Sequence, residues 1–337
     1  MQYLEIDAVK FFACIFIVFL HGIEPGDGIQ QALYLTGEYG IPLFWLVNGW
    51  LLADREIDFK YANRKAWKYI KFVGVWVLSL GIIISILEHK IAFIDLTIGI
   101  ISGKGLLFHL WFLLGLCVIY YLVATIRKCC NFNINNVCSS KLFILYMSII
   151  LTIAFAINLV VRIIYGVEIR DVIFPCFRII TNGGYFFIGV WLRKIHNTKI
   201  TKSMNQRGGV LITVFIFSLI LSLVVSKALC VQWASSMYCS LPVIYGTIAI
   251  FLLVTKRTLK LYSRFYNIIS CSTGIWILHP FVLRVINKIY RISISEIISI
   301  GDKCFITVLT IIISIIISII VTLCIKKIKY LRYMIME

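Results

Sequence analysis

The sequence predicts an all-α membrane protein, a bundle of about ten transmembrane helices. Hydrophobic residues make up 61% of the 337 residues and charged residues only 14%, and the mean hydropathy is +0.97. Soluble domains are closer to half apolar and a quarter charged. The apolar residues fall into runs long enough to cross a bilayer as helices, and basic residues gather in alternate connections. The net charge of +18 is therefore attributed to membrane topology and not to nucleic-acid binding.

The apolar runs can be followed in order along the chain. The second is short and lies between Gly37 and Asp54, and the last carries no charge. The sixth contains Pro175, Arg178 and Asn182-Gly183-Gly184, which predicts a kink or a broken helix. No connection is long enough for a soluble domain, so residues 1–337 are expected to form a single membrane domain. The runs lie near residues 4–23, 39–53, 69–87, 106–126, 142–161, 172–192, 209–227, 238–255, 268–286 and 305–325.

Lysine and arginine predict the orientation in the membrane. The even-numbered connections and the C-terminal tail hold most of the 33 basic residues, and the odd-numbered connections hold far fewer. Basic residues stay preferentially on the cytoplasmic side. Both termini are therefore expected in the cytoplasm, and the first outer connection is acidic, with Glu24, Asp27 and Glu38. The expected location is the cell (inner or plasma) membrane, with membrane lipid as a partner, and the sequence leaves a homo-oligomer open.

The first apolar run carries two ionisable residues on one face. Lys10 and His21 are eleven residues apart, which is about three helical turns plus 20° and about 16 Å along a helix axis. Ionisable groups inside a membrane are costly and usually line a cavity or take part in chemistry. The alternative is that Lys10 extends to the lipid headgroups and that His21 marks the other membrane interface.

Further polar residues are expected at the same depth as His21, in the outer half of the bundle. Shared depth does not prove proximity, because residues at one level can face in different directions. His109 beside Trp111 is also typical of an interfacial aromatic belt, and Pro280 makes the position of His279 a candidate helix break. The residues at this depth are Asn48 in the second predicted helix, His109 in the fourth, Arg178 in the sixth and His279 in the ninth.

The connection after the second predicted helix is strongly basic. Arg64 and Lys68 are one turn apart if the third helix begins early. Such a pair can hold the phosphates of a cytoplasmic ligand, or it can serve only as a topology signal or as an anchor on anionic lipid. The sequence has no glycine-rich phosphate loop or serine nucleophile elbow. Cys129, Cys130 and Cys138 lack the spacing of a metal site, so no metal is expected.

Several blocks of the sequence together resemble acyltransferase family 3, a family of integral membrane acyltransferases. Lys10 with its upstream Asp7, followed by His21, resembles the family's L-D-x-x-R and histidine pattern, with lysine in place of arginine. Lysine keeps the charge but loses the bidentate geometry of arginine. Arg64 and Lys68 resemble an R-x-x-x-R pattern, again with lysine at one position. The remaining blocks are Pro42–Leu51 with Asn48 at the family's serine position, His109-Leu110-Trp111-Phe112-Leu113, Tyr185–Leu192 and Ser272–Pro280.

The resemblance implies a fold of about ten helices and transfer of an acyl group, usually acetyl, onto extracytoplasmic glycans. It implies acetyl-CoA as the cytoplasmic donor and a surface glycan or lipid-linked saccharide as the acceptor. The short chain resembles the stand-alone members that modify surface polysaccharide. Under this hypothesis Arg64 and Lys68, together with Lys10, bind the donor, and His21 is the general base, since neutral imidazole suits catalysis near pH 7. A covalent acyl-imidazole intermediate stays open.

Other residues receive supporting roles in the same hypothesis. His109, Arg178 or Asn48 is expected to stabilise the oxyanion of the tetrahedral intermediate, and Trp111 and His279 are expected at the acceptor. A multi-pass transporter or flippase in glycan export is the main alternative function, since it too would have a broken helix and intramembrane charges. The sequence shows no visible two-fold repeat, which disfavours the transporter or flippase. A non-catalytic partner in glycan export is a further alternative.

Overall fold

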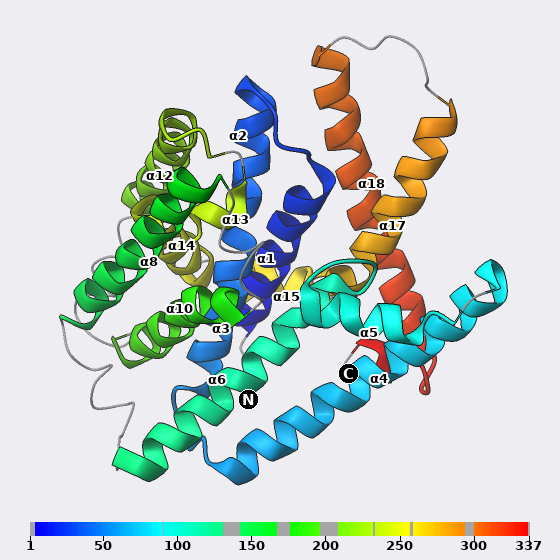
Figure 1. Ribbon diagram of the computed structural model, residues 1–337, viewed down its shortest axis with the longest axis horizontal. Helices are drawn as coiled ribbons and strands as arrows, with labels where there is room; N and C mark the ends of the chain where they lie inside the picture. Colours follow the sequence, from blue (N-terminus) through cyan, green and yellow to red (C-terminus); the bar gives the residue numbers. More distant parts are fainter. Residues whose placement is uncertain are drawn as a thin grey trace.

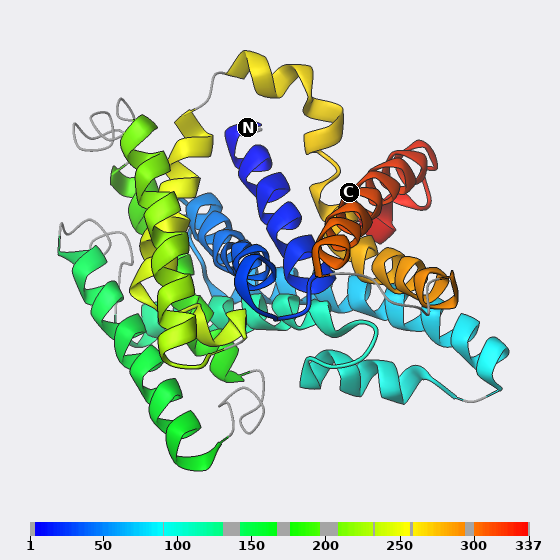
Figure 2. The same cartoon turned by 90° about the horizontal axis from the view of Figure 1, so that it is seen from above.

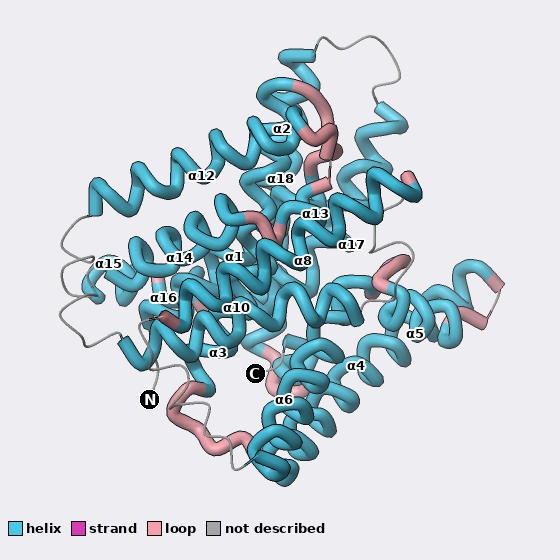
Figure 3. The backbone as a smooth tube through the Cα atoms, turned by 60° about the vertical axis from the view of Figure 1, so that its left-hand side comes forward, coloured by secondary structure: helices cyan, strands magenta, loops and turns pink. Residues whose placement is uncertain are grey.

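The computed structural model describes residues 4–89, 91–130, 142–166, 176–195, 208–231, 233–256, 259–293 and 300–335. These residues form helices and the turns that join them, with no strand among them (Figure 3). The elements are α1 (Leu4–Gly22), α2 (Gly28–Thr36), η1 (Gly37–Tyr39), α3 (Gly40–Leu52), α4 (Phe59–Glu88), α5 (Phe93–Ser102), η2 (Phe108–Leu110), α6 (Trp111–Cys130), α8 (Phe143–Tyr165), α10 (Cys176–Ile195), α12 (Gly208–Ala228), α13 (Ala234–Met237), α14 (Leu241–Lys256), α15 (Leu259–Arg264), α16 (Tyr266–Ile269), α17 (Ser272–Ser293), α18 (Ile300–Lys327) and η3 (Arg332–Ile335).

The predicted all-α class is confirmed, and each apolar run predicted from the sequence falls on a helix. In the described part of the chain, five helices are long and apolar enough to cross a membrane, and α5 and α14 are shorter apolar helices. The chain is therefore a multi-pass membrane protein. The number of spans and the cytoplasmic location of the termini stay predictions. The five helices are Phe59–Leu87, Phe108–Cys129, Phe143–Tyr165, Gly208–Ala228 and Phe305–Lys327.

Helix α1 lies in the middle of the bundle, with α17 and α18 on one side and α12 and α14 on the other (Figure 2). Val9, Ala13 and Val18 are fully buried, because α1 is apolar around most of its circumference and packs against α3, α14, α17 and α18. Glu5 and Asp7 lie in the first turn and His21 in the last, the ends that the helix dipole favours for such groups. The sequence thus places its first histidine at the end of a buried helix.

Helices α3 and α10 pack against each other through two glycines. A Cβ atom at Gly49 would overlap the carbonyl oxygen of Phe186, and a Cβ atom at Gly189 would overlap that of Leu46. Small residues let membrane helices approach closely enough for their backbones to touch. This crossing fixes α10, and with it Arg178, relative to α3.

The predicted break in the sixth helix is not found in the described residues. Helix α10 is continuous from Cys176 through the Asn182-Gly183-Gly184 sequence, and Pro175 lies outside the described residues. The Nδ2 of Asn182 donates to the carbonyl oxygen of Arg178 at 2.7 Å, which is compatible with the helix. Both glycines sit against branched side chains, Gly183 against Ile119 and Gly184 against Leu151. The glycines therefore serve packing and not bending.

The first outer connection is also more ordered than predicted. It contains α2, and Glu38 lies fully buried in η1 instead of facing water. Tyr39 Oη lies 2.8 Å from Ser218 Oγ, and Gln31 Nε2 donates to Ser226 Oγ at 3.2 Å. A row of serines on α12 thus holds α2 and η1 against the bundle. Helix α2 lies at the opposite end of the bundle from the N-terminus (Figure 1).

Helix α4 begins at Phe59, well before the apolar run that predicted it. Asp58 caps the helix by accepting a hydrogen bond from the backbone N–H of Tyr61 at 2.7 Å. The early start places Arg64 and Lys68 one turn apart on a helix, the arrangement expected from the sequence. The beginning of α4 lies at the same end of the bundle as the N-terminus (Figure 1).

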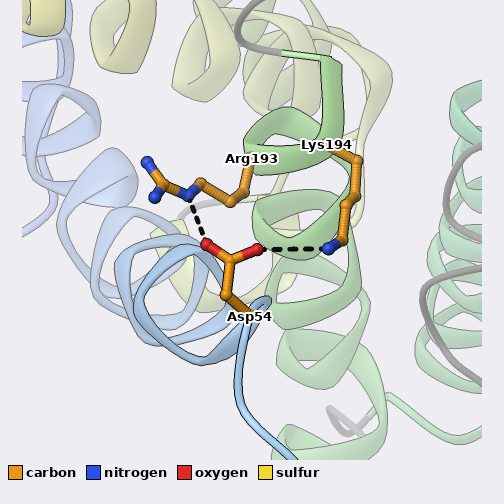
Figure 4. Close-up of polar contacts among 3 residues, drawn as sticks. All are labelled: Asp54, Arg193 and Lys194. Atoms are coloured by element: carbon orange, nitrogen blue, oxygen red, sulfur yellow. Dashed lines mark hydrogen bonds and ion pairs between the residues drawn. The ribbon is translucent and has the colours of Figure 1, made fainter.

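Asp54 joins the ends of α3 and α10 at the surface. Its carboxylate accepts from Arg193 Nε at 2.9 Å and from Lys194 Nζ at 3.1 Å (Figure 4). Partial burial acts to raise the pKa of Asp54, but the two hydrogen bonds and the two positive charges outweigh it and hold the pKa below its usual value. The side chain is 56% exposed, so we expect the pair of contacts to contribute little stability.

Candidate active site

Three histidines from distant parts of the sequence meet in the structure. The imidazole rings of His21 and His279 stack with their centroids 5.5 Å apart and an interplanar angle of 17°. The ring of His109 lies 6.0 Å from that of His279. The sequence predicted only that these histidines share a depth. In the structure they also lie next to one another, with His21 at the end of α1, His109 in η2 and His279 on α17.

Helix α17 holds His279 in a fixed orientation. The helix runs through Pro280 without ending, so His279 does not mark the helix break that the sequence left open. Its Nδ1 lies 3.0 Å from the carbonyl oxygen of Ile275. Because a carbonyl oxygen only accepts, Nδ1 carries a proton, and in the neutral imidazole Nε2 then carries the lone pair. Nε2 is buried and has no hydrogen-bond partner among the described residues.

His109 is held by the turn that precedes α6. The residue is nearly fully buried, and neither ring nitrogen has a hydrogen-bond partner within the described part of the chain. Its ring packs edge-on against Trp276 at 5.4 Å and against Phe108 at 5.7 Å. Buried imidazole nitrogens without partners cost free energy, so such groups are usually retained for binding or chemistry.

His21 and His109 line a cavity of about 560 Å³. Its wall is mostly aromatic and aliphatic, with a small number of charged and polar groups, which is typical of a small-molecule site. The aromatic members are Tyr34, Phe44, Phe108, Trp111, Phe112, Trp233, Tyr238 and Trp276, and the titratable members besides the tyrosines are His21, Glu24, His109 and Arg178.

Arg178 brings a guanidinium group from α10 to the same cavity. Its Cζ lies 5.7 Å from the centroid of the Trp111 ring, a cation–π distance. On another side it faces Gly103, where a Cβ atom would lie 2.7 Å from Nη1. Gly103 also has φ +67°, a conformation that glycine adopts without strain. A glycine at this turn therefore leaves space for the guanidinium group beside Trp111.

The structure does not bring the other predicted residues to this cavity. Lys10 donates from Nζ to Asp7 Oδ1 at 2.9 Å within α1. Asn48 donates from Nδ2 to the Phe44 carbonyl oxygen at 2.8 Å within α3. Arg64 and Lys68 are exposed on α4. The cavity wall that the described residues form includes none of these four side chains. His279 is also not in this wall and meets the site through the ring of His21.

Several wall residues were missed from the sequence. Trp276 is three residues before His279 on α17, so helical spacing could have indicated it. Glu24 follows the end of α1, where helical spacing gives no guidance. Tyr34 lies in α2, and Trp233 and Tyr238 flank the short helix α13, where no motif marks them. In the described residues no group of three histidine, cysteine or acidic side chains is arranged to hold a metal ion. Cys138 lies outside those residues.

The fold and the site define a multi-pass, all-helical membrane protein with a histidine cluster at a buried aromatic cavity. The acyltransferase domain that defines acyltransferase family 3 matches residues 3–325 of the 337, so the chain belongs to this family and is a membrane acyltransferase. The resemblance predicted from the sequence is thereby confirmed. No curated protein and no solved structure matches the chain.

Proposed function

We propose that this protein is a membrane O-acetyltransferase that moves an acetyl group from cytoplasmic acetyl-CoA to a hydroxyl of an extracytoplasmic or lipid-linked glycan. The observation that carries the proposal is the position of His21, stacked on His279 at the wall of an aromatic cavity. Flat aromatic side chains pack well against the C–H faces of sugar rings. A neutral imidazole at such a wall is suited to accept a proton from a sugar hydroxyl.

The proposed transfer uses these groups in two steps, an addition to the thioester carbonyl and an elimination of the CoA thiolate. His21 accepts the hydroxyl proton while the oxygen attacks the thioester carbonyl, which forms the new C–O bond and an oxyanion. Arg178 and His109, both on the cavity wall, are the candidates for stabilising that oxyanion. When the C–S bond breaks, the protonated His21 returns the proton to the thiolate of CoA.

The donor is proposed to approach from the end of the bundle where α4 begins. CoA carries phosphates that cannot enter a membrane cheaply, and Arg64 and Lys68 are exposed cations at that end. Lys10 lies about 16 Å along α1 from His21, toward the N-terminal end of that helix. The extended arm of CoA is long enough for its thioester to lie far from its phosphates. Lys10, Arg64 and Lys68 are therefore proposed to bind the donor, and Trp111 and His279 to position the acceptor.

The decisive experiment uses the purified full-length protein in nanodiscs with radiolabelled acetyl-CoA and an oligosaccharide acceptor. We expect label on the acceptor, and a rate at least about 10²-fold lower for His21→Asn, the lower range for losing a general base. The matched control is His89→Asn, because His89 is an exposed histidine at the C-terminal end of α4, away from the cavity. His21→Asn activity within a few-fold of wild type would remove His21 from the chemistry. No label transfer by the wild type to any glycan tested would favour a transport function.

A further inference from the structure

A second cavity, of about 570 Å³, lies on the other side of His21. It shares the side chains of His21 and Phe108 with the aromatic cavity. Its remaining wall has two parts. One part is apolar and consists of Leu106, Pro280 and Leu283, with Gly105 beside them, and the other is polar and consists of Arg284, Asn287 and Lys288.

The polar part of this second cavity is positively charged. Arg284 and Lys288 are four residues apart on α17, so their side chains leave the same face of the helix. No acidic residue is among the described wall residues. Two like charges one turn apart on a helix surface repel each other, and a bound anion offsets that repulsion. A guanidinium, an ammonium and an amide together suit a phosphate group.

The same stretch of α17 also presents apolar side chains outward. Val285 is 58% exposed and Ile289 is 61% exposed, and both lie on α17 next to the basic residues. In a multi-pass membrane protein, exposed large apolar side chains face lipid. The second cavity thus combines cations with apolar walls and a lipid-facing flank. This combination fits an amphiphile whose phosphate lies against Arg284 and Lys288 and whose chain stays in the membrane.

We propose that the second cavity binds the phosphate group of a lipid-borne saccharide, which is the acceptor. This inference rests on the proposed function and names its acceptor class. His21 belongs to the walls of both cavities, so a phosphate in the second cavity places the attached sugar beside His21 and the aromatic cavity. Arg284 and Lys288 act as binding residues that select acceptors by charge. An anionic phospholipid headgroup offers the same chemistry, and the experiment separates the two sources.

The test compares two acceptors that carry the same disaccharide, with the full-length protein in phosphatidylcholine nanodiscs. One disaccharide is joined through a diphosphate to an isoprenoid chain, and the other is an uncharged alkyl glycoside. For Arg284→Gln/Lys288→Gln, we expect the ratio of kcat/KM for the diphosphate acceptor over the alkyl glycoside to fall at least tenfold relative to wild type. Lys227→Gln is the matched control, because Lys227 is an exposed lysine at the end of α12, and it should leave the ratio unchanged. An unchanged ratio in the double variant overturns the proposal.

Native mass spectrometry without acetyl-CoA gives a second readout that does not depend on transfer. The wild type should retain the diphosphate acceptor, and Arg284→Gln/Lys288→Gln should lose it. Loss of bound phosphatidylglycerol alone, with acceptor binding intact, would assign the cavity to a phospholipid headgroup and overturn the acceptor assignment. A wild type that binds the acceptor at this pair but transfers no acetyl group would refute the proposed activity and leave the binding site standing.

Discussion

The rings of His21 and His279 stack face to face at a centroid distance of 5.5 Å, although the two residues are far apart in the sequence. His279 is fixed by the bond from its Nδ1–H to the Ile275 carbonyl, so the lone pair of Nε2 points away from its own helix carbonyl. One ring therefore has a defined tautomer and supports the face of the other. Such an arrangement orients a base before a substrate arrives, which is how catalytic groups gain efficiency.

The first prediction concerns His279. Replacing it by phenylalanine keeps an aromatic ring against His21 but removes the buried Nε2, which has no partner among the described residues. We expect His279→Phe to keep or raise the melting temperature in detergent, because an unsatisfied buried nitrogen costs about 1–3 kcal/mol. We also expect a higher KM for the glycan acceptor. An unaltered KM together with a raised melting temperature would leave His279 with packing as its only role.

The second prediction concerns the charge of Lys10. Its ammonium group pairs with Asp7 at 2.9 Å, and both side chains are only partly exposed. Lys10→Ala leaves that carboxylate without its cation, and we expect the KM for acetyl-CoA to rise about tenfold, in the range for a lost charged hydrogen bond. Lys10→Arg keeps the charge and should stay within a few-fold of wild type. Equal losses in the two variants would show that the shape of lysine, and not its charge, matters at this position.

The third prediction concerns the contact between α3 and α10. Gly49→Ala drives a methyl group into the backbone of α10 at Phe186, so one helix must shift. We expect a loss of about 1–3 kcal/mol, the usual cost of overpacking, measured as unfolding in detergent. Gly74→Ala is the control, because a Cβ atom at Gly74 meets nothing within 4 Å and alanine favours helix by up to about 1 kcal/mol. Equal stabilities of the two variants would contradict the tight crossing.

The fourth prediction concerns pH and Asp54. Because its pKa is lowered in the folded protein, the ion pairs with Arg193 and Lys194 stabilise the fold above the pKa of an unfolded aspartate. That contribution is lost as the pH falls through the lower, folded-state pKa. We therefore expect the melting temperature of wild type to exceed that of Asp54→Asn slightly at pH 7, and the difference to shrink as the pH falls below about 4 and to vanish below the folded-state pKa. A difference in melting temperature that grows as the pH is lowered would contradict this prediction.

Much of this fold could be predicted because membrane helices are recognisable in a sequence from their length and hydropathy. The sequence also placed the histidines at one depth, since depth follows from position along a helix. It could not show that they touch, because rotation and tilt come from packing. The contact between Gly22 of α1 and Ile311 of α18 is one such packing detail, and no sequence pattern indicates it.

Errors arose where local signals had more than one physical meaning. Asn182-Gly183-Gly184 favoured a break, but these glycines accommodate Ile119 and Leu151 on neighbouring helices. The sequence indicated Glu38 only as part of an acidic outer connection, but it is fully buried in η1, where its neighbour Tyr39 contacts Ser218 on α12. In both cases the deciding contact comes from a residue distant in the sequence.

The crossing at Gly49 and Gly189 has a mechanical consequence. Where two main chains touch with no side chain between them, neither can roll or slide without a clash of backbone atoms. Helices α3 and α10 therefore behave as one rigid frame that carries Phe44 and Arg178 together. If the acceptor proposed above requires the cavity to widen, we expect the movement in other wall elements, such as α17 with Trp276 and the turn before α6 with Phe108.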